Sequence, residues 1–471
     1  MLFFKKKPEA TITLFNTKGR EKQVFEPLTA GRVKMYSCGP TVYDYVHIGN
    51  LRAFLLSDII RRTFEYAGYQ VTQVMNITDF GHLVGDGDEG EDKMSLALKR
   101  EGKPITMENM LALASMYAAA FKEDIAAFNI RTPQYLPRAS EHVRGMVAYI
   151  ETLLHKGYAY QISDGIYFDT AKWPEYGALG GSASEKHSRI GVSGEKHDPR
   201  DFALWKFSRD MGWEAPWGRG FPGWHIECTA MSTRYLGKTF DIHTGGIDHI
   251  PVHHNNEIAQ AEAANAKPYA RYWLHNEFIT IDNARVAKSV GNTITLRQLN
   301  ERGISALGYR YWLLTGHYRQ SMNFTWEAVE AAQTALHRAL KIFADLQGSG
   351  PVDAAYKEKF DAAIYDDFAT PEAIAVMWEL IKDERVAPGV KRATLLDFDR
   401  ILGIGLSQKR AFAKVAVSDI PEAVAAMVAE REAARKAGDW ARADAVRDAV
   451  RAQGFDIEDT PRGPRVKPVL P

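Results

Sequence analysis

The segment KMYSCGPTVYDYVHIGNLRAFLLSDIIRRTFEYAGYQVTQVM, residues 34–75, indicates the kind of sheet that this chain can build. Residues 34–38 form an apolar stretch typical of a strand, and residues 69–75 alternate in polarity and are rich in β-forming residues. Between them, over residues 51–67, apolar side chains recur at helical spacing. This order predicts a strand–helix–strand unit, and therefore an α/β fold with a Rossmann-like parallel sheet covered by helices.

Downstream of this unit, changes in composition predict further domains. Residues 160–220 are mixed and rich in Gly, Trp and Lys, which indicates an insertion in the sheet domain. A helical, Ala-rich pattern runs from Trp326 to about Leu402, and a long polar helix is predicted from Pro421 to Gln453. We therefore expect a domain at 1–325, with an insertion at about 120–220 and a loop region at about 275–325, a helical domain at 326–405, and a small C-terminal domain at 415–471.

The composition excludes several classes of protein. Two cysteines in 471 residues argue against a disulfide scaffold and fit a reducing, cytoplasmic location. No apolar run approaches the roughly 20 residues that a membrane span requires, so we expect no membrane partner. The 59 basic and 59 acidic residues balance, so any contact with nucleic acid must come from a local patch.

The two cysteines lie near other residues that can bind a metal. Cys38 follows the first predicted strand, and Cys228 ends the segment GWHIEC. His253 and Glu257 are four residues apart, so they project from one face if this segment is helical. Two thiols, one imidazole and one carboxylate are ligands that zinc takes. The alternative is two buried free cysteines beside a polar helix.

Two separate loops have the residue types that bind phosphate. His47, Gly49 and Asn50 precede the predicted helix, whose N-terminus offers unpaired N–H groups to an anion. Some 240 residues later, Arg285 and Lys288 provide two cations three residues apart within a Gly-, Asn- and Ser-containing segment. Such a loop can hold a triphosphate as charge moves to pyrophosphate. Each loop taken alone could equally be a solvated turn.

Together, these motifs resemble class I aminoacyl-tRNA synthetases and, more narrowly, the cysteinyl-tRNA synthetases. The resemblance covers residues from about Leu14 to Lys467, and the matching order of the motifs makes it specific. The motifs are CGPTVYD with HIGN at 38–50, GWHIEC at 223–228, FDIH at 240–243, HHNNE at 253–257, and RVAKS at 285–289.

The resemblance implies one zinc ion per chain, bound by Cys38, Cys228, His253 and Glu257, and a cysteine substrate bound to it as thiolate. It also implies an amino-acid pocket, an ATP site accompanied by Mg²⁺, and catalytic side chains. The pocket residues are Cys38, Gly39, Thr41 and Trp224; the ATP-binding residues are His47, Gly49, Gly245, Gly246, Asp248 and Lys288; the catalytic residues are His47, Asn50, Arg285 and Lys288.

An independent chemical argument supports the zinc. Serine differs from cysteine by one atom, and a pocket selects poorly between such similar side chains. A soft metal that prefers thiolate to hydroxyl provides the missing selectivity. Asn50, Val286 and Ala287 depart from the usual family pattern, and Arg285 replaces a lysine, which keeps the charge but changes its geometry.

The C-terminal segment suggests an RNA contact. Its basic residues accompany Trp440, a combination that suits unstacked bases. They are Arg431, Arg435, Lys436, Arg442, Arg447 and Arg451. A solvated helix with paired charges is the alternative, because Glu432 and Asp444 lie among them. The family resemblance implies that Arg435, Asp444 and Asp459 contact the anticodon of tRNA(Cys).

Three functions are consistent with these observations. The first is ATP-dependent activation of L-cysteine and its transfer to tRNA(Cys) by a monomeric enzyme. The second is a related ligase that joins cysteine to an amino sugar in mycothiol synthesis, which would lack the anticodon-binding end. The third is a non-catalytic, zinc-bearing paralogue that binds tRNA, for which the altered residues around Lys288 are the support.

Overall fold

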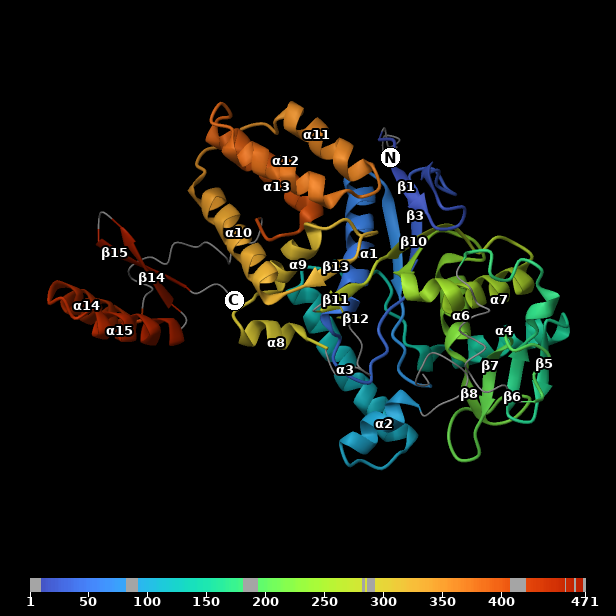
Figure 1. Cartoon of the computed structure of the whole chain (residues 1–471). Coiled ribbons are helices and arrows are strands. Elements are labelled where there is room, and N and C mark those ends of the chain that lie inside the picture. Colours follow the sequence, from blue (N-terminus) through green and yellow to red (C-terminus); the bar gives the residue numbers. More distant parts are fainter. Residues whose placement is uncertain are drawn as a thin grey trace, which may run out of the picture.

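A four-stranded parallel sheet lies at the centre of the N-terminal part of the molecule (Figure 1). The computed structural model describes residues 10–81, 92–180, 194–281, 284–285, 293–406, 421–453, 455–460 and 463–468. The strand order is β10-β9-β3-β4, and helices cover both faces of the sheet, as is usual for parallel sheets. The strands are β3 (Arg32–Ser37), β4 (Gln70–Met75), β9 (Phe240–Gly246) and β10 (Ala270–Asn276).

The predicted strand–helix–strand unit is confirmed. Helix α1 (Ile48–Tyr66) connects β3 to β4 and begins three residues earlier than the apolar periodicity indicated. The side chain of Asn50 accepts a hydrogen bond from the His47 N–H at 3.2 Å, which caps the first turn. The helix ends before Gly68, whose positive φ of 93° allows the chain to reverse into β4.

The two faces of the sheet bury different helices. Side chains alternate along each strand, so Met35 and Leu274 pack with α1, whereas Tyr36 and Trp273 pack with α6 (Trp224–Leu236). Helix α7 (Asn255–Asn265) follows β9 and lies beside α6 on this second face.

Between β4 and β9 the chain forms further helices and a separate antiparallel sheet of order β5-β6-β7-β8. The antiparallel sheet lies within residues 159–222, in the segment for which the sequence predicts an insertion. The elements are α2 (Lys93–Arg100), α3 (Met107–Ala127), α4 (Val143–His155), β5 (Ala159–Ile162), β6 (Gly165–Phe168), β7 (Phe202–Phe207) and β8 (Gly220–Pro222).

After β10 come a small three-stranded sheet and a helical region that shares one hydrophobic core with α1. The strands of this sheet are β11 (Ile279–Ile281), β12 (Ala284–Arg285) and β13 (Met322–Phe324). Near the N-terminus, before β3, a separate hairpin is formed by β1 (Thr13–Asn16) and β2 (Glu21–Val24). The helices are α8 (Leu296–Glu301), α9 (Ala306–Leu314), α10 (Trp326–Asp345), α11 (Ala354–Tyr365), α12 (Thr370–Lys382) and α13 (Pro388–Leu402). The predicted domain boundaries stay predictions.

The C-terminal helix is where the sequence-based prediction is wrong. Instead of one helix over 421–453, the chain forms α14 (Glu422–Lys436) and α15 (Trp440–Ala452), followed by a hairpin of β14 (Phe455–Thr460) and β15 (Gly463–Pro468). Gly438 has a positive φ of 78°, and the Asp439 side chain accepts from the Arg442 N–H at 3.0 Å to start a second helix. The turn lets Val424, Val450 and Ile457 share a small core, which one straight helix could not form.

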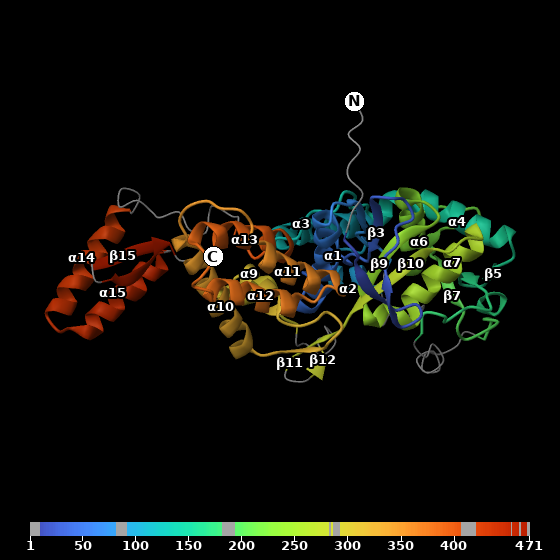
Figure 2. The same ribbon diagram turned by 90° about the horizontal axis from the view of Figure 1, so that it is seen from above.

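Figure 2 shows this C-terminal unit beyond α10, on the side of the helical region away from the parallel sheet. Across the described ranges, no helix combines the length and the apolar composition that crossing a membrane requires.

A buried group of charges ties α1 to the helical region. Asp58 Oδ2 accepts hydrogen bonds from Arg62 Nε and Arg310 Nη2, each at 2.7 Å. Arg310 also donates from Nε to the carbonyl of Leu402, at the end of α13, at 2.8 Å. Burial opposes ionisation of Asp58, but the two guanidinium groups outweigh it and hold its pKa below the usual value.

We expect Asp58→Asn to lower the free energy of unfolding by about 3–5 kcal/mol, because it leaves two buried guanidinium groups without their counter-charge. Urea denaturation measures the change. In the wild type this stabilisation is present above the unfolded-state pKa of about 3.9 and is lost as the pH falls through the lower folded-state pKa. The control is Glu301→Gln, in an exposed pair with Arg297, with an expected effect within about 0.5 kcal/mol. Equal effects in the two variants would contradict the prediction.

Candidate metal centre and nucleotide site

The carboxyl ends of β3 and β9 bring the four predicted metal-binding side chains together. Cys38 directly follows β3, and Cys228 lies on α6. His253 lies in a π-helical turn, Ile250–His254, that runs directly into α7, which carries Glu257. All four side chains are buried, and their ligand atoms lie within 4.8 Å of one another. Zinc binding by this set stays a prediction, but the required geometry is present.

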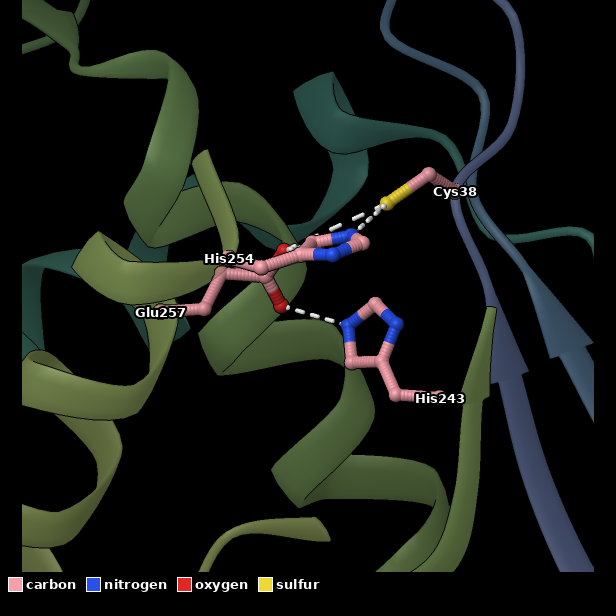
Figure 3. Close-up of side chains that lie close together, drawn as sticks. All are labelled: Cys38, His243, His254 and Glu257. Atoms are coloured by element: carbon pink, nitrogen blue, oxygen red, sulfur yellow. Dashed lines mark hydrogen bonds and ion pairs between the residues drawn. The ribbon is translucent and has the colours of Figure 1, made fainter. Parts of the chain in front are cut away.

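Residues from the same region form a second, overlapping group that the sequence reasoning missed. Cys38 and Glu257 also lie close to His243 and His254 (Figure 3). His243 Nε2 is 2.8 Å from Glu257 Oε2, and His254 Nε2 is 3.4 Å from Cys38 Sγ. The available signals were the place of His243 in the FDIH motif and that of His254 next to His253, but neither motif indicates which atoms these two imidazoles face.

The two oxygens of Glu257 have different surroundings. Oε2 accepts a hydrogen bond from Tyr269 Oη at 2.9 Å in addition to its contact with His243. Oε1 lies 2.9 Å from His253 Nε2 and 4.0 Å from Cys38 Sγ. Oε1 is therefore the oxygen that faces the predicted ligand set, while Oε2 is held by outer residues, the usual arrangement behind a metal-binding carboxylate.

The charges of this cluster favour a bound cation. Burial raises the pKa of the Cys38 thiol, whereas a hydrogen bond with Cys38 lowers the pKa of Cys228 to about 6. Burial opposes protonation of His253, but Glu257 and Cys228 beside it raise its pKa to about 10. The lowered pKa of Cys228 favours its thiolate, which is the form that binds a metal. Burial opposes ionisation of Glu257, but His243 and His253 outweigh it and hold the pKa of this carboxyl below its usual range. Sulfur, nitrogen and oxygen ligands of this kind around one buried position fit zinc.

The predicted amino-acid pocket residues lie around the same centre. The Trp224 ring lies 4.1 Å from the His253 ring, centroid to centroid, and Trp224 is half-buried. Thr41 pairs with Thr78 in a short parallel bridge beyond β3 and β4. At Gly39, a Cβ atom would lie 1.7 Å from the carbonyl oxygen of Asn76, so the loop after Cys38 passes too close to its neighbour for any side chain.

The predicted nucleotide residues that the structure describes lie at two places. His47, Gly49 and Asn50 lie at the start of α1, where the exposed Asn50 side chain already caps the helix. The Ile48 N–H donates to the carbonyl of Ile294 at 2.7 Å, which places the chain that follows the cationic loop next to this helix N-terminus. Lys288 lies outside the described residues.

The second place is the end of β9. A Cβ at Gly245 would lie 2.7 Å from ring atoms of His249 and His254, and one at Gly246 would lie 2.3 Å from Asp248 Oδ1. Gly245 therefore excludes a side chain because the His254 ring is buried, whereas at Gly246 the exposed Asp248 side chain would have to move. Arg285 lies in β12, which pairs with β11.

The residues predicted to contact RNA lie partly within the described ranges, and the contacts themselves stay a prediction. The Arg435 guanidinium lies 5.9 Å from the ring centroid of Trp440, whose side chain is 61% exposed, at the turn between α14 and α15. Asp444 is exposed on α15, and Asp459 lies in β14 with its side chain outside the described part. Arg431 corrects one part of this prediction. The sequence groups it with the basic residues of the RNA contact, but its side chain is buried and pairs with Glu432 at 2.8 Å.

A third group with metal-ligand spacing, Asp169, His197 and Asp201, lies in the inserted segment. Asp201 Oδ1 accepts from the Thr170 N–H and hydroxyl at 2.8 and 2.7 Å, and Lys172 Nζ lies 3.3 Å from Asp169 Oδ2. These contacts give both buried carboxylates hydrogen-bond or ion-pair partners within the protein, so the group does not require a metal to be satisfied.

Comparison with known proteins shows similarity along almost the whole chain. The model of the class I tRNA synthetase (C) catalytic domain matches residues 24–334, a DALR domain model matches 359–404, and the cysteinyl-tRNA ligase anticodon binding domain matches 417–464. Cysteine–tRNA ligase 1 of Burkholderia lata is 46% identical, covering 97% of this chain and 96% of that protein. Cysteine–tRNA ligase of Thermus thermophilus is 39% identical, covering 96% and 98%.

Solved structures support the fold. The Mycobacterium tuberculosis methionyl-tRNA synthetase in complex with methionyl-adenylate has a TM-score of 0.53 at 16% identity, covering 80% of this chain and 91% of that one. An Agrobacterium radiobacter LeuRS in a ternary complex has a TM-score of 0.60 at 11% identity, covering 81% and 84%. The predicted fold class is confirmed.

We expect Gly39→Ala to lower both the melting temperature and the bound metal, because the added Cβ would displace the loop that carries Cys38. Thermal denaturation and elemental analysis of the purified protein measure the two effects. The matched control is Gly145→Ala on α4, where no atom outside the adjacent residues and the helix's own backbone lies within 4 Å of the added carbon. That substitution is expected to stabilise the protein by about 0.5–1 kcal/mol. Unchanged metal content in Gly39→Ala would contradict the prediction.

Proposed function

The chain belongs to the cysteinyl-tRNA ligase family of class I tRNA synthetases, and from this premise we propose that it activates L-cysteine with ATP and transfers it to tRNA(Cys). The observation that carries the proposal is the buried group Cys38, Cys228, His253 and Glu257 at the carboxyl edge of the parallel sheet. Ligands of such sheets bind at this edge. Similarity to cysteine–tRNA ligases over nearly the full length supports the same activity.

We assign the cysteine-selecting centre to these four residues and one zinc ion. Zinc, when bound, favours a thiolate over a hydroxyl and lowers the pKa of a thiol, which gives selectivity against serine. The protein contributes the arrangement around it. His243 and Tyr269 hold the outer oxygen of Glu257, and Trp224 packs along His253 beside the centre. Burial of all four ligand residues excludes water that would compete for the substrate's place.

We infer that ATP, with Mg²⁺, binds at the N-terminus of α1 and contacts Lys288. His47 and Gly49 lie where helix N–H groups and the helix dipole favour phosphate, and Arg285 and Lys288 supply positive charge. A carboxylate oxygen of cysteine attacks the α-phosphorus, the bond to the bridging oxygen breaks, and pyrophosphate leaves. The protein acts by positioning and by stabilising the charge that develops, so no side chain forms a covalent intermediate.

In the second step, a hydroxyl of the tRNA 3′ end attacks the carbonyl carbon of cysteinyl-adenylate, and AMP leaves. We assign anticodon recognition to the C-terminal unit, with Arg435 and the exposed Trp440 side by side. The match of residues 417–464 to an anticodon binding domain supports tRNA over an amino sugar as acceptor. A monomeric state and a cytoplasmic location stay predictions.

We expect the purified protein to contain about one zinc ion per chain and to exchange pyrophosphate into ATP when cysteine is present. Selectivity against serine should exceed the roughly 100-fold that pocket shape alone provides. Elemental analysis and an exchange assay with each amino acid measure this. Bound zinc without exchange would support the non-catalytic paralogue, and exchange without tRNA charging would support the amino-sugar ligase.

We expect Arg435→Ala to lower kcat/KM for tRNA(Cys) charging by a factor equivalent to about 1–3 kcal/mol of lost binding free energy. Pyrophosphate exchange should be unchanged, because a base contact affects only the tRNA-dependent step. Both assays are run on the same preparation. Lys267→Ala, which removes an exposed cation between α7 and β10, is the control for loss of charge. An equal loss in exchange and charging would count against the assignment of Arg435.

A further inference from the structure

A chain of hydrogen bonds between buried groups connects the loop of Cys38 with the helix of Cys228. The Gly39 N–H donates to Asn76 Oδ1 at 2.9 Å, and Asn76 Nδ2 donates to Thr78 Oγ1 at 3.1 Å. The Thr78 hydroxyl then donates to Glu227 Oε2 at 2.8 Å. Asn76, Thr78 and Glu227 are 2%, 1% and 0% exposed, so water does not compete for these bonds. We call these three residues the brace.

The direction of each bond in the brace is determined by its chemistry. An amide NH₂ group can only donate, so the Thr78 oxygen accepts from Asn76 and its single proton is left for Glu227. Thr78 is itself held beside the loop: its N–H donates to the carbonyl of Pro40, and the Val42 N–H donates to its carbonyl, each at 3.0 Å. The hydroxyl of Thr78 is therefore the one link between the loop and Glu227 within the brace.

The ends of the brace lie next to the two thiol ligands in sequence. Gly39 follows Cys38, and Glu227 precedes Cys228. On its other side, the loop is held by the Cys38 N–H, which donates to the carbonyl of Thr244 on β9 at 3.2 Å. The first thiol is thus held between β9 and the brace, and the brace continues to the segment that carries the second thiol.

A purely stabilising role accounts poorly for Glu227. Its Oε1 is buried and has no hydrogen-bond partner among the described residues. A buried polar atom without a partner costs free energy, so Glu227 is an unfavourable choice if its function is only to fill space. Its Oε2, by contrast, accepts the hydrogen bond from the Thr78 hydroxyl that completes the brace.

We propose that Asn76, Thr78 and Glu227 are positioning residues that hold the thiols of Cys38 and Cys228 at the separation and orientation needed for a shared metal ion. This inference rests on the proposed zinc centre. Residues behind metal ligands commonly contribute 10- to 100-fold to metal affinity when they are hydrogen-bonded to the ligands. Here the contribution passes through the backbone next to each cysteine.

The experiment compares zinc affinity, by competition with a chelator, in the wild type and four variants of the full-length protein. Thr78→Val removes the hydroxyl at nearly constant shape, and Glu227→Leu removes the acceptor. Glu227→Gln keeps an acceptor oxygen for Thr78. Thr63→Val is the matched control, because Thr63 on α1 is equally buried and its hydroxyl has no hydrogen-bond partner in the described ranges. Melting temperatures are recorded for all.

We expect Thr78→Val and Glu227→Leu to bind zinc about tenfold or more weakly, Glu227→Gln to remain within about threefold of the wild type, and Thr63→Val to be unchanged. The thiolate charge-transfer absorption of the Co²⁺-substituted protein should change in the first two variants only. That spectrum reports the geometry at sulfur independently of catalysis.

If Thr78→Val binds zinc as tightly as Thr63→Val, the proposed role of the brace is overturned. If Thr78→Val does not fold, the Glu227 variants decide: equal zinc affinity in Glu227→Leu and Glu227→Gln would also overturn it. A wild type that binds no zinc would instead refute the proposed metal centre, so the two failures are distinguishable.

Discussion

The parallel pairing of β3 with β9 is the constraint on which the site depends. Its register places Ser37 opposite Thr244, so residues some 200 positions apart in sequence become neighbours at one edge of the sheet. Because the strands are parallel, both carboxyl ends open at that edge, and the chain leaves β3 at Cys38 and β9 toward the turn with His253. An antiparallel pairing would send these residues to opposite ends of the sheet.

Two buried clusters of charge show how a structural site and a functional site differ. Asp58 lies between two guanidinium groups whose remaining donors reach backbone carbonyls, so the hydrogen bonds of these three side chains are satisfied within the protein. At the candidate metal centre, two thiols, an imidazole and a carboxylate instead point at one another from four separate places in the chain. The first cluster is complete as a hydrogen-bonded structural group. The second collects the ligand types that zinc takes, and a metal would bind their deprotonated forms.

Several features were predictable from sequence because they depend on local chemistry. The apolar spacing in residues 51–67 predicted α1, and the alternation after it predicted β4, since helices and strands have different side-chain periods. The C-terminal helix was predicted wrongly for a local reason as well. One glycine, Gly438, adopts a positive φ, and the polar sequence around it does not indicate whether the helix continues or turns. The small core of Val424, Val450 and Ile457 decides that the chain turns.

The sequence by itself determined which residue types are available: two cysteines, and a histidine and a glutamate at helical spacing, in an order shared with a known family. It could not determine which oxygen of Glu257 faces the centre, that His243 and Tyr269 hold the other, or that Thr78 joins the two cysteine-bearing segments. These relations are contacts between residues distant in the chain. Only the tertiary structure decides them, because they depend on how the helices pack against the sheet and not on local propensity.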